Sequence, residues 1–278
     1  MAKNSSILRE YWSGKSVLIT GASSGLGWAL TEALAPYGVT FGLLSRREEK
    51  MQELADSLKH TDSTFWIRGC DIRDREAVFA AVNDFHEHAG RIDVAWANSG
   101  ISAPSSFKKW DWELIDACLK TNLYGTMHTV KACLNHMVPR KQGTIVGIGS
   151  MASVRGLPTR GVYSLTKISI QYLLESLSAE LPFIQFTTIH PGFVDTPIIA
   201  SNKNAFWVVP ADRAADLMLH AVARKKAVYI FPFRMRMLYH IIRLLPQKLF
   251  TGGMRKFFRR AEKPELSETE KQAITSTN

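Results

Sequence analysis

Cysteine is scarce in this chain: Cys70, Cys118 and Cys133 are the three in 278 residues, and none forms a Cys-x2-Cys pair. An odd number of widely spaced thiols argues against a disulfide framework and against a cysteine-rich zinc site, so we expect a reducing compartment. The eight histidines include no His-x3-His pair that could hold a metal from one helix face, and no metal site is expected.

Long apolar runs are also missing. Residues 1–15 mix charged and polar side chains and lack the apolar core of a signal peptide. No uncharged stretch approaches the ~18 apolar residues that suggest a membrane span. These absences predict a protein that folds in the cytoplasm.

Acidic residues are absent from Leu217 to Ala261, a region that contains eleven Lys or Arg. The whole chain carries +10, so the rest of it carries a net −1 once these eleven charges are subtracted. The basicity therefore belongs to one C-terminal region. The other composition values, 46% hydrophobic and 22% charged residues, are those of an ordinary globular protein long enough for one large α/β domain.

Short apolar runs rich in Val and Ile alternate with segments of helical periodicity. Buried strands that alternate with helices form a parallel sheet covered on both faces, because right-handed crossovers leave few other arrangements. The pattern predicts a doubly wound parallel α/β sheet of about seven strands. Strands are expected at 16–20, 39–44, 64–70, 92–97, 144–148, 184–189 and 227–231, and helices at 26–34, 48–58, 74–88, 111–137 and 162–181.

A glycine-rich loop joins the first predicted strand to the first predicted helix. Glycines let the backbone turn tightly and approach a pyrophosphate, which then lies at the positive N-terminus of the helix. The spacing is Gly-x3-Gly-x-Gly, not the common Gly-x-Gly-x2-Gly, and such a loop alone is compatible with a plain turn. Its place between strand and helix favours dinucleotide binding. The candidate residues are Gly21, Ser23, Ser24, Gly25, Leu26 and Gly27.

The second predicted strand ends in Ser45, Arg46 and Arg47. A site for NAD has a carboxylate there for the ribose 2′-hydroxyl, whereas the 2′-phosphate of NADP(H) needs cations. Ser45 stands where the acid would be and two arginines follow, although a solvated basic turn has the same composition. We therefore expect NADP(H), with Asp71 after the third strand as a partner for the adenine.

Tyr163 and Lys167 are four positions apart at the start of a predicted helix, so they share one face. A free phenol has a pKa near 10, about 3 units too high for proton exchange at neutral pH. A lysine roughly 5 Å away contributes about 3 kcal/mol at an effective dielectric near 20, which would lower that pKa by about 2 units. The same pair is common on exposed helices, so its context decides.

Other polar residues fall at the carboxyl ends of the strands, where ligands bind in a doubly wound sheet. Ser150 follows the strand 144–148 and can hold a substrate oxygen while Tyr163 exchanges a proton. Asn122, unless it is a plain surface residue, offers an amide to a water in a proton relay. The remaining candidates are Asn98, Ser99 and Gly100 after the fourth strand, and Pro191, Gly192, Val194 and Thr196 after the sixth, where the nicotinamide carboxamide would bind.

These residues, in this order, resemble the short-chain dehydrogenase/reductase family in its ordinary, non-extended form over about residues 14–232. Two positions depart from the family pattern: Ser99 stands where alanine is usual, and Gly147 where asparagine is frequent. The resemblance implies a Rossmann-type NADP-binding domain at 1–232 and a homodimer or homotetramer paired through two long helices. It also implies a catalytic tetrad of Asn122, Ser150, Tyr163 and Lys167, with Lys167 holding the ribose.

The basic region continues after the last predicted strand as an amphipathic helical segment at 233–261, followed by a polar tail at 262–278. Apolar residues beside cations, with no acids, suit a helix that lies on anionic lipid and makes the protein peripheral to a membrane. The same segment would also suit a cap on the substrate cleft or contact with a partner subunit. Nucleic acid is not expected, because no recognised binding module is present.

Together these features predict an NADP(H)-dependent oxidoreductase that interconverts a carbonyl and a secondary alcohol. Hydride would pass to or from C4 of the nicotinamide while Tyr163 exchanges the proton. Phe193, Phe206 and Trp207 near the expected substrate loop favour a lipophilic substrate. The competing hypothesis is a non-enzymatic NADP(H)-binding sensor or membrane-associated scaffold, although a pure binder has no use for Tyr163.

Overall fold

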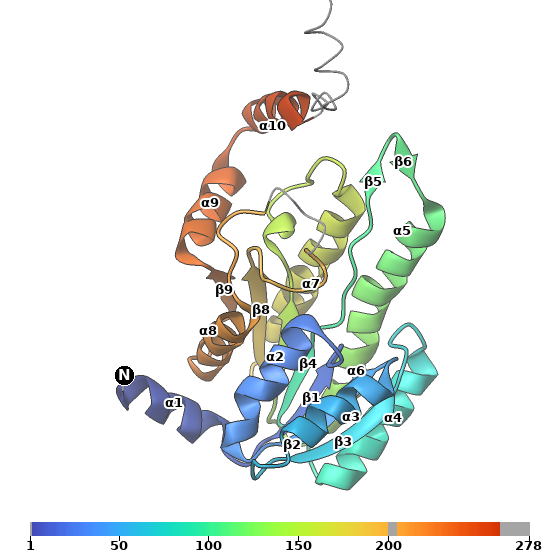
Figure 1. The fold of residues 1–278 in the computed structure, drawn as a ribbon, viewed down its shortest axis with the longest axis vertical. Helices are drawn as coiled ribbons and strands as arrows, with labels where there is room; N and C mark the ends of the chain where they lie inside the picture. The colour runs from blue at the N-terminus through green and yellow to red at the C-terminus, as the bar shows by residue number, and fades with distance from the viewer. Residues whose placement is uncertain (1, 200–204, 262–278) are drawn as a thin grey trace, which may run out of the picture. The chain divides into compact units, whose positions relative to one another are not determined.

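A parallel seven-stranded sheet forms the centre of the main unit, with the order β3-β2-β1-β4-β7-β8-β9 (Figure 1). The computed structural model describes residues 2–199 and 205–261, so the predicted tail at 262–278 lies outside the described residues. The chain divides into two compact units, 1–239 and 240–278. The strands are β1 (Ser16–Thr20), β2 (Thr40–Ser45), β3 (Thr64–Gly69), β4 (Val94–Ala97), β7 (Thr144–Ile148), β8 (Gln185–Pro191) and β9 (Val228–Phe231).

The sheet order confirms the predicted doubly wound fold. The chain runs outward from β1 through β2 to β3, and then returns to place β4 on the other side of β1. From β4 it winds in the opposite direction to β9, with every neighbouring pair parallel. The reversal between β1 and β4 opens a crevice at their carboxyl ends, which is where ligands bind in sheets of this kind.

Helices cover both faces of this sheet because each strand is apolar on both sides. One core is built by α1 (Ala2–Trp12), α2 (Gly25–Leu34), α3 (Glu48–Ser57) and α8 (Ala211–Ala223). The opposite core is built by α4 (Arg75–Ala89), α6 (Gly125–Met137) and α7 (Gly161–Glu180). The helices α1 and α8, and a hairpin of β5 (Ser105–Ser106) and β6 (Lys109–Trp110), were not predicted from the sequence.

The prediction of a single helix at 111–137 is wrong in one respect. The structure has α5 (Trp112–Leu119), then a π-helical turn at Lys120–Tyr124, and then α6. The Asp111 carboxylate caps α5 by accepting from the amide of Leu114. The wider turn contains Asn122, which is fully buried, so this residue is not the surface asparagine that a regular helix allowed.

The basic segment predicted as helical at 233–261 consists of two helices, α9 (Phe233–Leu244) and α10 (Gln247–Ala261). Pro246 lies between them, where its ring and missing N–H prevent one continuous helix. The first turns of α9 bury Met235 and Tyr239 within the main unit. No helix in the described part of the chain is both long and apolar enough to cross a bilayer.

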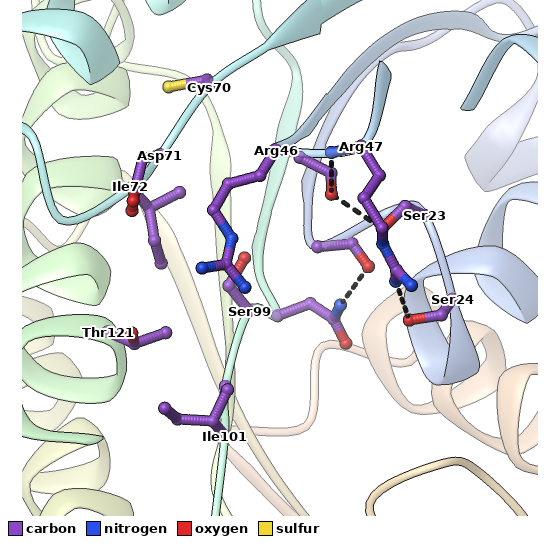
Figure 2. Close-up of a pocket in the computed structure, with 14 residues that line it drawn as sticks. Ser23, Ser24, Arg46, Arg47, Cys70, Asp71, Ile72, Ser99, Ile101 and Thr121 are labelled. Atoms are coloured by element: carbon purple, nitrogen blue, oxygen red, sulfur yellow. Dashed lines mark hydrogen bonds between the residues drawn. The ribbon is translucent and has the colours of Figure 1, made fainter. Parts of the chain in front are cut away.

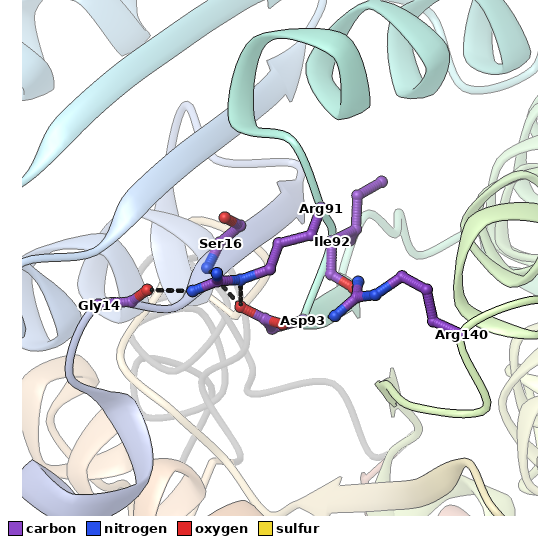
Figure 3. Close-up of polar contacts among 6 residues, drawn as sticks. All are labelled: Gly14, Ser16, Arg91, Ile92, Asp93 and Arg140. Atoms are coloured by element: carbon purple, nitrogen blue, oxygen red, sulfur yellow. Dashed lines mark hydrogen bonds and ion pairs between the residues drawn. The ribbon is translucent and has the colours of Figure 1, made fainter.

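At the amino edge of the sheet a buried carboxylate joins three segments (Figure 3). Asp93, 8% exposed, accepts hydrogen bonds from the Ser16 amide at 3.0 Å, from Arg91 Nε at 2.9 Å and from Arg140 at 3.3 Å. Arg91 also donates to the Gly14 carbonyl. Burial alone would raise the pKa of Asp93, but the amide and the two guanidinium groups outweigh it and lower that pKa.

Candidate functional site

Two adjoining pockets lie along the carboxyl ends of the strands, where the sequence places its candidate residues. The first is polar and is formed by the loop after β1 and by the ends of β2, β3 and β4 (Figure 2). It brings together ten of the predicted cofactor residues: Gly21, Ser23, Ser24, Ser45, Arg46, Arg47, Asp71, Asn98, Ser99 and Gly100.

The glycines of the loop after β1 are required by close backbone packing. Gly21 and Gly25 have φ of +72° and +57°, values that side chains disfavour. A Cβ on Gly27 would lie 2.3 Å from the Gly21 carbonyl oxygen. The backbone can therefore pass near a ligand at the N-terminus of α2, an arrangement suited to a pyrophosphate. Gly25 and Gly27 shape this loop from behind and do not line the pocket.

The arginines at the end of β2 have different surroundings. Arg47 donates to Ser23 and Ser24 Oγ, each at 2.9 Å, and so braces the glycine-rich loop. Ser45 and Ser23 are joined by their hydroxyls at 2.7 Å. Arg46 makes no hydrogen bond to any described residue, and Figure 2 shows its guanidinium extending into the pocket, away from Arg47. A cation without a hydrogen bond, in a pocket that also contains serine hydroxyls, fits a phosphate group.

Asp71, the expected adenine partner, lines the same pocket but already has a cation beside it. Arg73 donates to both carboxylate oxygens, including Nε to Oδ2 at 2.8 Å. This hydrogen bonding is the largest cause of a lowered pKa for Asp71, and the charge of Arg46 contributes further. A carboxylate held in this way remains ionised at neutral pH and keeps a fixed position at the pocket wall.

The second pocket contains Ser150, Tyr163 and Lys167, which come from the end of β7 and the first turns of α7. The Ser150 and Tyr163 side chains are hydrogen-bonded to each other. Lys167 Nζ lies 5.8 Å from the centroid of the Tyr163 ring. The predicted residues Leu26, Pro191, Gly192, Val194 and Thr196 also line this pocket, together with Met151, Leu157, Phe193, Ile198 and Ile199.

The pKa of Tyr163 differs from the sequence-based expectation. Burial raises this pKa above its ordinary value, although the hydrogen bond to Ser150 and the charge of Arg160 oppose the rise. The expectation counted the attraction of Lys167 for a phenolate and left out the cost of removing the phenolate from water. In the protein without ligand the phenol is therefore a neutral proton donor, not an acidified one.

Lys167 is almost completely buried, and burial lowers its pKa to about 8. Its ammonium donates to the Ile148 carbonyl at 2.8 Å. A Cβ on Gly100 would lie 3.0 Å from this ammonium, so the chain after β4 passes directly beside it. The amine is held at the junction of the two pockets and is poised to gain charge stabilisation from an anionic ligand.

Asn122 lies behind the pockets, and its amide is already hydrogen-bonded. Oδ1 accepts from the Ile101 amide at 2.8 Å, while Nδ2 donates to the Ile101 carbonyl at 2.8 Å and to Thr166 Oγ1 at 3.1 Å. The expected water-binding amide is thus used to fix the segment after β4 against α7. In this structure Asn122 positions the wall of the site instead of facing it.

His190 belongs to the site but was not singled out from the sequence. It is fully buried, accepts the Ser150 amide on Nδ1 at 3.2 Å, and has Ser153 Oγ 2.9 Å from the same nitrogen. The other ring nitrogen, Nε2, lies 2.9 Å from Gln171 Oε1. Nδ1 also lies 3.1 Å from the Ser150 carbonyl oxygen, so its role as donor or acceptor depends on the tautomer. The neutral Nε2–H tautomer fits the contacts with the Ser150 amide and with Gln171. The signal in the sequence was its place at the end of β8, directly before Pro191.

A second residue missed by the sequence analysis is Cys118. Its buried thiol lies 3.4 Å from Asn122 Nδ2 and 3.6 Å from the Ile101 carbonyl. Burial raises the pKa of this thiol, so it remains neutral beside Lys167. It therefore acts as a packing residue of the site wall.

Comparison with known proteins agrees with this architecture. Residues 15–205 match the family described as short chain dehydrogenase. An uncharacterized oxidoreductase of Myxococcus xanthus is 31% identical over 87% of this chain and 97% of its own, and a fatty acyl-CoA reductase of Acinetobacter baylyi is 28% identical over 80% and 78%. An alcohol dehydrogenase of Thermococcus sibiricus, solved with 5-hydroxy-NADP, superimposes with a TM-score of 0.71 at 25% identity over 79% of this chain and 95% of its own.

The family match covers more than half of the chain, and the fold is the one that the resemblance implied. The chain therefore belongs to the short-chain dehydrogenase/reductase family and is an oxidoreductase of that family.

Proposed function

We propose that the protein is an NADP(H)-dependent oxidoreductase that interconverts a lipophilic carbonyl compound and the corresponding secondary alcohol. The observation that carries this proposal is the grouping of Ser150, Tyr163 and Lys167 in a pocket that adjoins the polar pocket containing Arg46. The first set can hold and protonate a carbonyl oxygen. The second offers an unbonded cation to a 2′-phosphate.

The residues present fit a nicotinamide dinucleotide. The glycine-rich loop carries no side chain at Gly21, Gly25 or Gly27 that could keep a pyrophosphate from its backbone. Arg46 makes no hydrogen bond to any described residue. Ser45, Arg46 and Arg47 would hold the adenosine phosphate end, and Lys167 the ribose near the substrate. When bound, the cofactor supplies or accepts the hydride.

The chain's own residues account for the proton. Ser150 donates a hydrogen bond to the substrate carbonyl oxygen and polarises it, while Tyr163 gives its phenolic proton to the same oxygen during reduction. The raised pKa of Tyr163 keeps that proton in place until the substrate is bound. The charge of Lys167 stabilises the phenolate that remains, which makes transfer of the proton to the substrate oxygen more favourable.

Apolar lining of the second pocket favours a lipophilic substrate. Leu157, Phe193, Ile198 and Ile199 face this cavity. Among the described residues, the only cation in its wall besides Lys167 is Arg160, which donates to Ser102 Oγ. The relative from Acinetobacter baylyi is named a fatty acyl-CoA reductase, which is in line with a long apolar substrate.

The test is NADPH oxidation with a panel of aldehydes and ketones of increasing chain length. We expect turnover by the wild type and a loss of about 1,000-fold or more in Tyr163→Phe. Tyr172→Phe is the matched control, since Tyr172 is an exposed tyrosine on the same helix. Equal traces from wild type and Tyr163→Phe, with NADPH binding intact, would favour the non-enzymatic sensor instead.

We also propose a homodimer or homotetramer, as the family resemblance implies. Exposed apolar residues on the two long helices support this proposal: Tyr124 beside α6, and Leu165 and Tyr172 on α7, are each more than half exposed. Light scattering on the purified chain measures the mass directly. A monomer at micromolar concentration would contradict the proposal.

A further inference from the structure

Exposed aromatic and cationic side chains lie next to the substrate pocket, in a surface that the proposed reaction does not use. We call it the loop–helix patch, because it joins the loop before α8 to the first turns of α9. Its members are Phe206, Trp207, Phe233, Arg234, Arg236 and Met237.

A chain of ring contacts connects this patch to the pocket wall. Phe193, which lines the substrate pocket, contacts Phe206 with ring centroids 5.3 Å apart. Phe206 contacts Trp207 at 5.1 Å, and the Arg234 guanidinium lies 5.7 Å from the Trp207 ring centroid. The apolar surface is thus continuous from the site to the outside of the molecule.

The α9 helix has two different faces in this part of the chain. Met235 and Tyr239 are buried, and a Cβ on Gly192 would lie 2.8 Å from Met235, so the inner face packs beneath the substrate pocket. Phe233 and Met237, one turn apart, are 64% and 49% exposed. Arg236 lies 5.0 Å from the Phe233 ring, and keeps a cation beside the exposed apolar residues.

This composition is typical of a surface that rests on a bilayer. Aromatic side chains sit at the level of the lipid headgroups, and arginines beside them bind anionic lipids. Four of the six patch residues, those of α9, belong to the region 217–261, which contains eleven cations and no acid. The C-terminal unit adds exposed Lys248, Arg255 and Lys256 to the same stretch of sequence.

A second copy of the chain fits the loop–helix patch less well than anionic lipid does. A two-fold contact places the same patch on both sides, so it would bring Arg234 and Arg236 of both copies into one interface. No acid anywhere in 217–261 could neutralise them. Anionic lipid offers negative headgroups to the arginines of the patch and an apolar layer to its exposed aromatic side chains.

We propose that the loop–helix patch docks on an anionic lipid bilayer and turns the mouth of the substrate pocket toward it. The docking itself is independent of the reaction. The consequence that substrate enters from the membrane rests on the proposed function.

The first test is co-sedimentation of the full chain with vesicles of phosphatidylcholine containing about 30% phosphatidylserine at low salt. The double variant Arg234→Glu/Arg236→Glu should bind at least about tenfold more weakly, because four units of charge are changed at the surface. The control is Lys225→Glu/Lys226→Glu, which makes the same charge change at the exposed turn before β9, at the opposite end of that strand. It should bind nearly as well as the wild type.

The second test reports contact with the lipid interior. Brominated phosphatidylcholine should quench the fluorescence of the wild type in these vesicles, and Trp207→Phe should lose most of that quenching. Phe233→Ser should weaken binding several-fold, whereas Phe183→Ser, the same change at the amino edge of the sheet, should not. Thermal stabilisation by NADPH verifies that each variant is folded.

Equal binding of all charge variants, or equal quenching in Trp207→Phe, would overturn the proposal. Retention on a single-stranded oligonucleotide with no vesicle binding would overturn it in favour of nucleic acid. Neither result bears on NADPH oxidation in solution, so a failure here is distinguishable from a failure of the proposed function.

Discussion

At the amino edge of the sheet polar side chains satisfy one another, whereas at the carboxyl edge several are left without a full set of partners. Asp93 is surrounded by three donors, and Tyr11 contacts Thr144 Oγ1 at 2.9 Å across the same edge. At the opposite edge, Arg46 has no hydrogen bond within the described residues, and burial lowers the pKa of Lys167 to about 8. The two edges belong to the same strands, only a few residues apart.

This difference separates stability from function within one sheet. A carboxylate that is buried with its hydrogen bonds complete contributes to the free energy of unfolding and offers nothing to a ligand. A buried cation lowers the stability of the protein, and both a buried cation and an exposed one without a hydrogen bond gain a partner when an anion binds. Substitutions at the amino edge should therefore change unfolding, and substitutions at the carboxyl edge should change binding and turnover.

The largest expected effect is on the free energy of unfolding in Asp93→Ala. The change leaves the buried Ser16 amide without its acceptor and removes the carboxylate that Arg91 and Arg140 share. We expect a loss of about 3 kcal/mol, at the lower end for a broken buried pair because both arginines reach solvent. Urea denaturation at pH 7 measures it, while the affinity for NADPH should be unchanged in the folded variant.

The pH dependence of this loss has a fixed sign. Because the folded-state pKa of Asp93 is lowered, its contribution is present above about pH 4 and disappears as the pH falls through the folded pKa. Wild type and Asp93→Ala should therefore converge in strong acid. Asp84→Ala is the control: its ion pair with Arg68 is exposed, and it should cost no more than about 0.5 kcal/mol. An equal loss in both variants would contradict the contrast between the edges.

The second effect concerns cofactor choice at the carboxyl edge. Arg46→Ala should weaken NADPH binding about 30-fold and NADH binding little, because its guanidinium is free to meet a 2′-phosphate. Ser45→Asp should further reverse the preference, since a carboxylate there accepts from the ribose 2′-hydroxyl and repels the phosphate. Fluorescence titration with both reduced dinucleotides measures the ratio. Equal weakening of NADH and NADPH by Arg46→Ala would show a structural role.

The strands and the pocket residues were predictable because they depend on local patterns. The glycine spacing after β1, the Ser-Arg-Arg end of β2 and the four-residue interval from Tyr163 to Lys167 each place a side chain by its element alone. The helix α8 carried a signal that was passed over: Ala214, Ala215, Met218, Leu219 and Val222 are buried and recur at helical spacing.

What the sequence could not give depends on burial and on contacts between distant segments. In the π-helical turn, Asn122 stands at the spacing that a regular helix would give a buried position between Cys118 and Thr126, so nothing local marks the turn. The pKa of Tyr163 is raised because the phenol is buried, and the spacing of residues along the sequence does not reveal that burial. His190 matters through Ser150 and Gln171, which lie 40 and 19 residues away along the chain.

The third effect tests whether His190 positions Ser150 through one particular nitrogen. In His190→Asn the amide oxygen takes the place of Nδ1 and can still accept from the Ser150 amide, whereas His190→Gln keeps only a donor toward Gln171. We expect His190→Asn to keep kcat within about threefold, and His190→Gln to lower kcat about tenfold at unchanged NADPH affinity. If both variants lose activity equally, the histidine only fills space.

The smallest effect is a dependence of NADPH affinity on pH that follows from Lys167. In the empty protein burial lowers its pKa to about 8, and the negative charge of a bound dinucleotide favours the ammonium, so binding takes up a proton above that pH. Affinity should be constant below pH 8 and fall about tenfold between pH 8 and 9.5. Lys167→Met should abolish the fall, while Tyr163→Phe should retain it, because the raised pKa of Tyr163 keeps the phenol neutral throughout this range. Calorimetry in two buffers of different ionisation enthalpy counts the proton directly. If the fall in NADPH affinity with pH persists in Lys167→Met, a group other than Lys167 takes up the proton. The contrast drawn between Lys167 and Asp93 would then not hold.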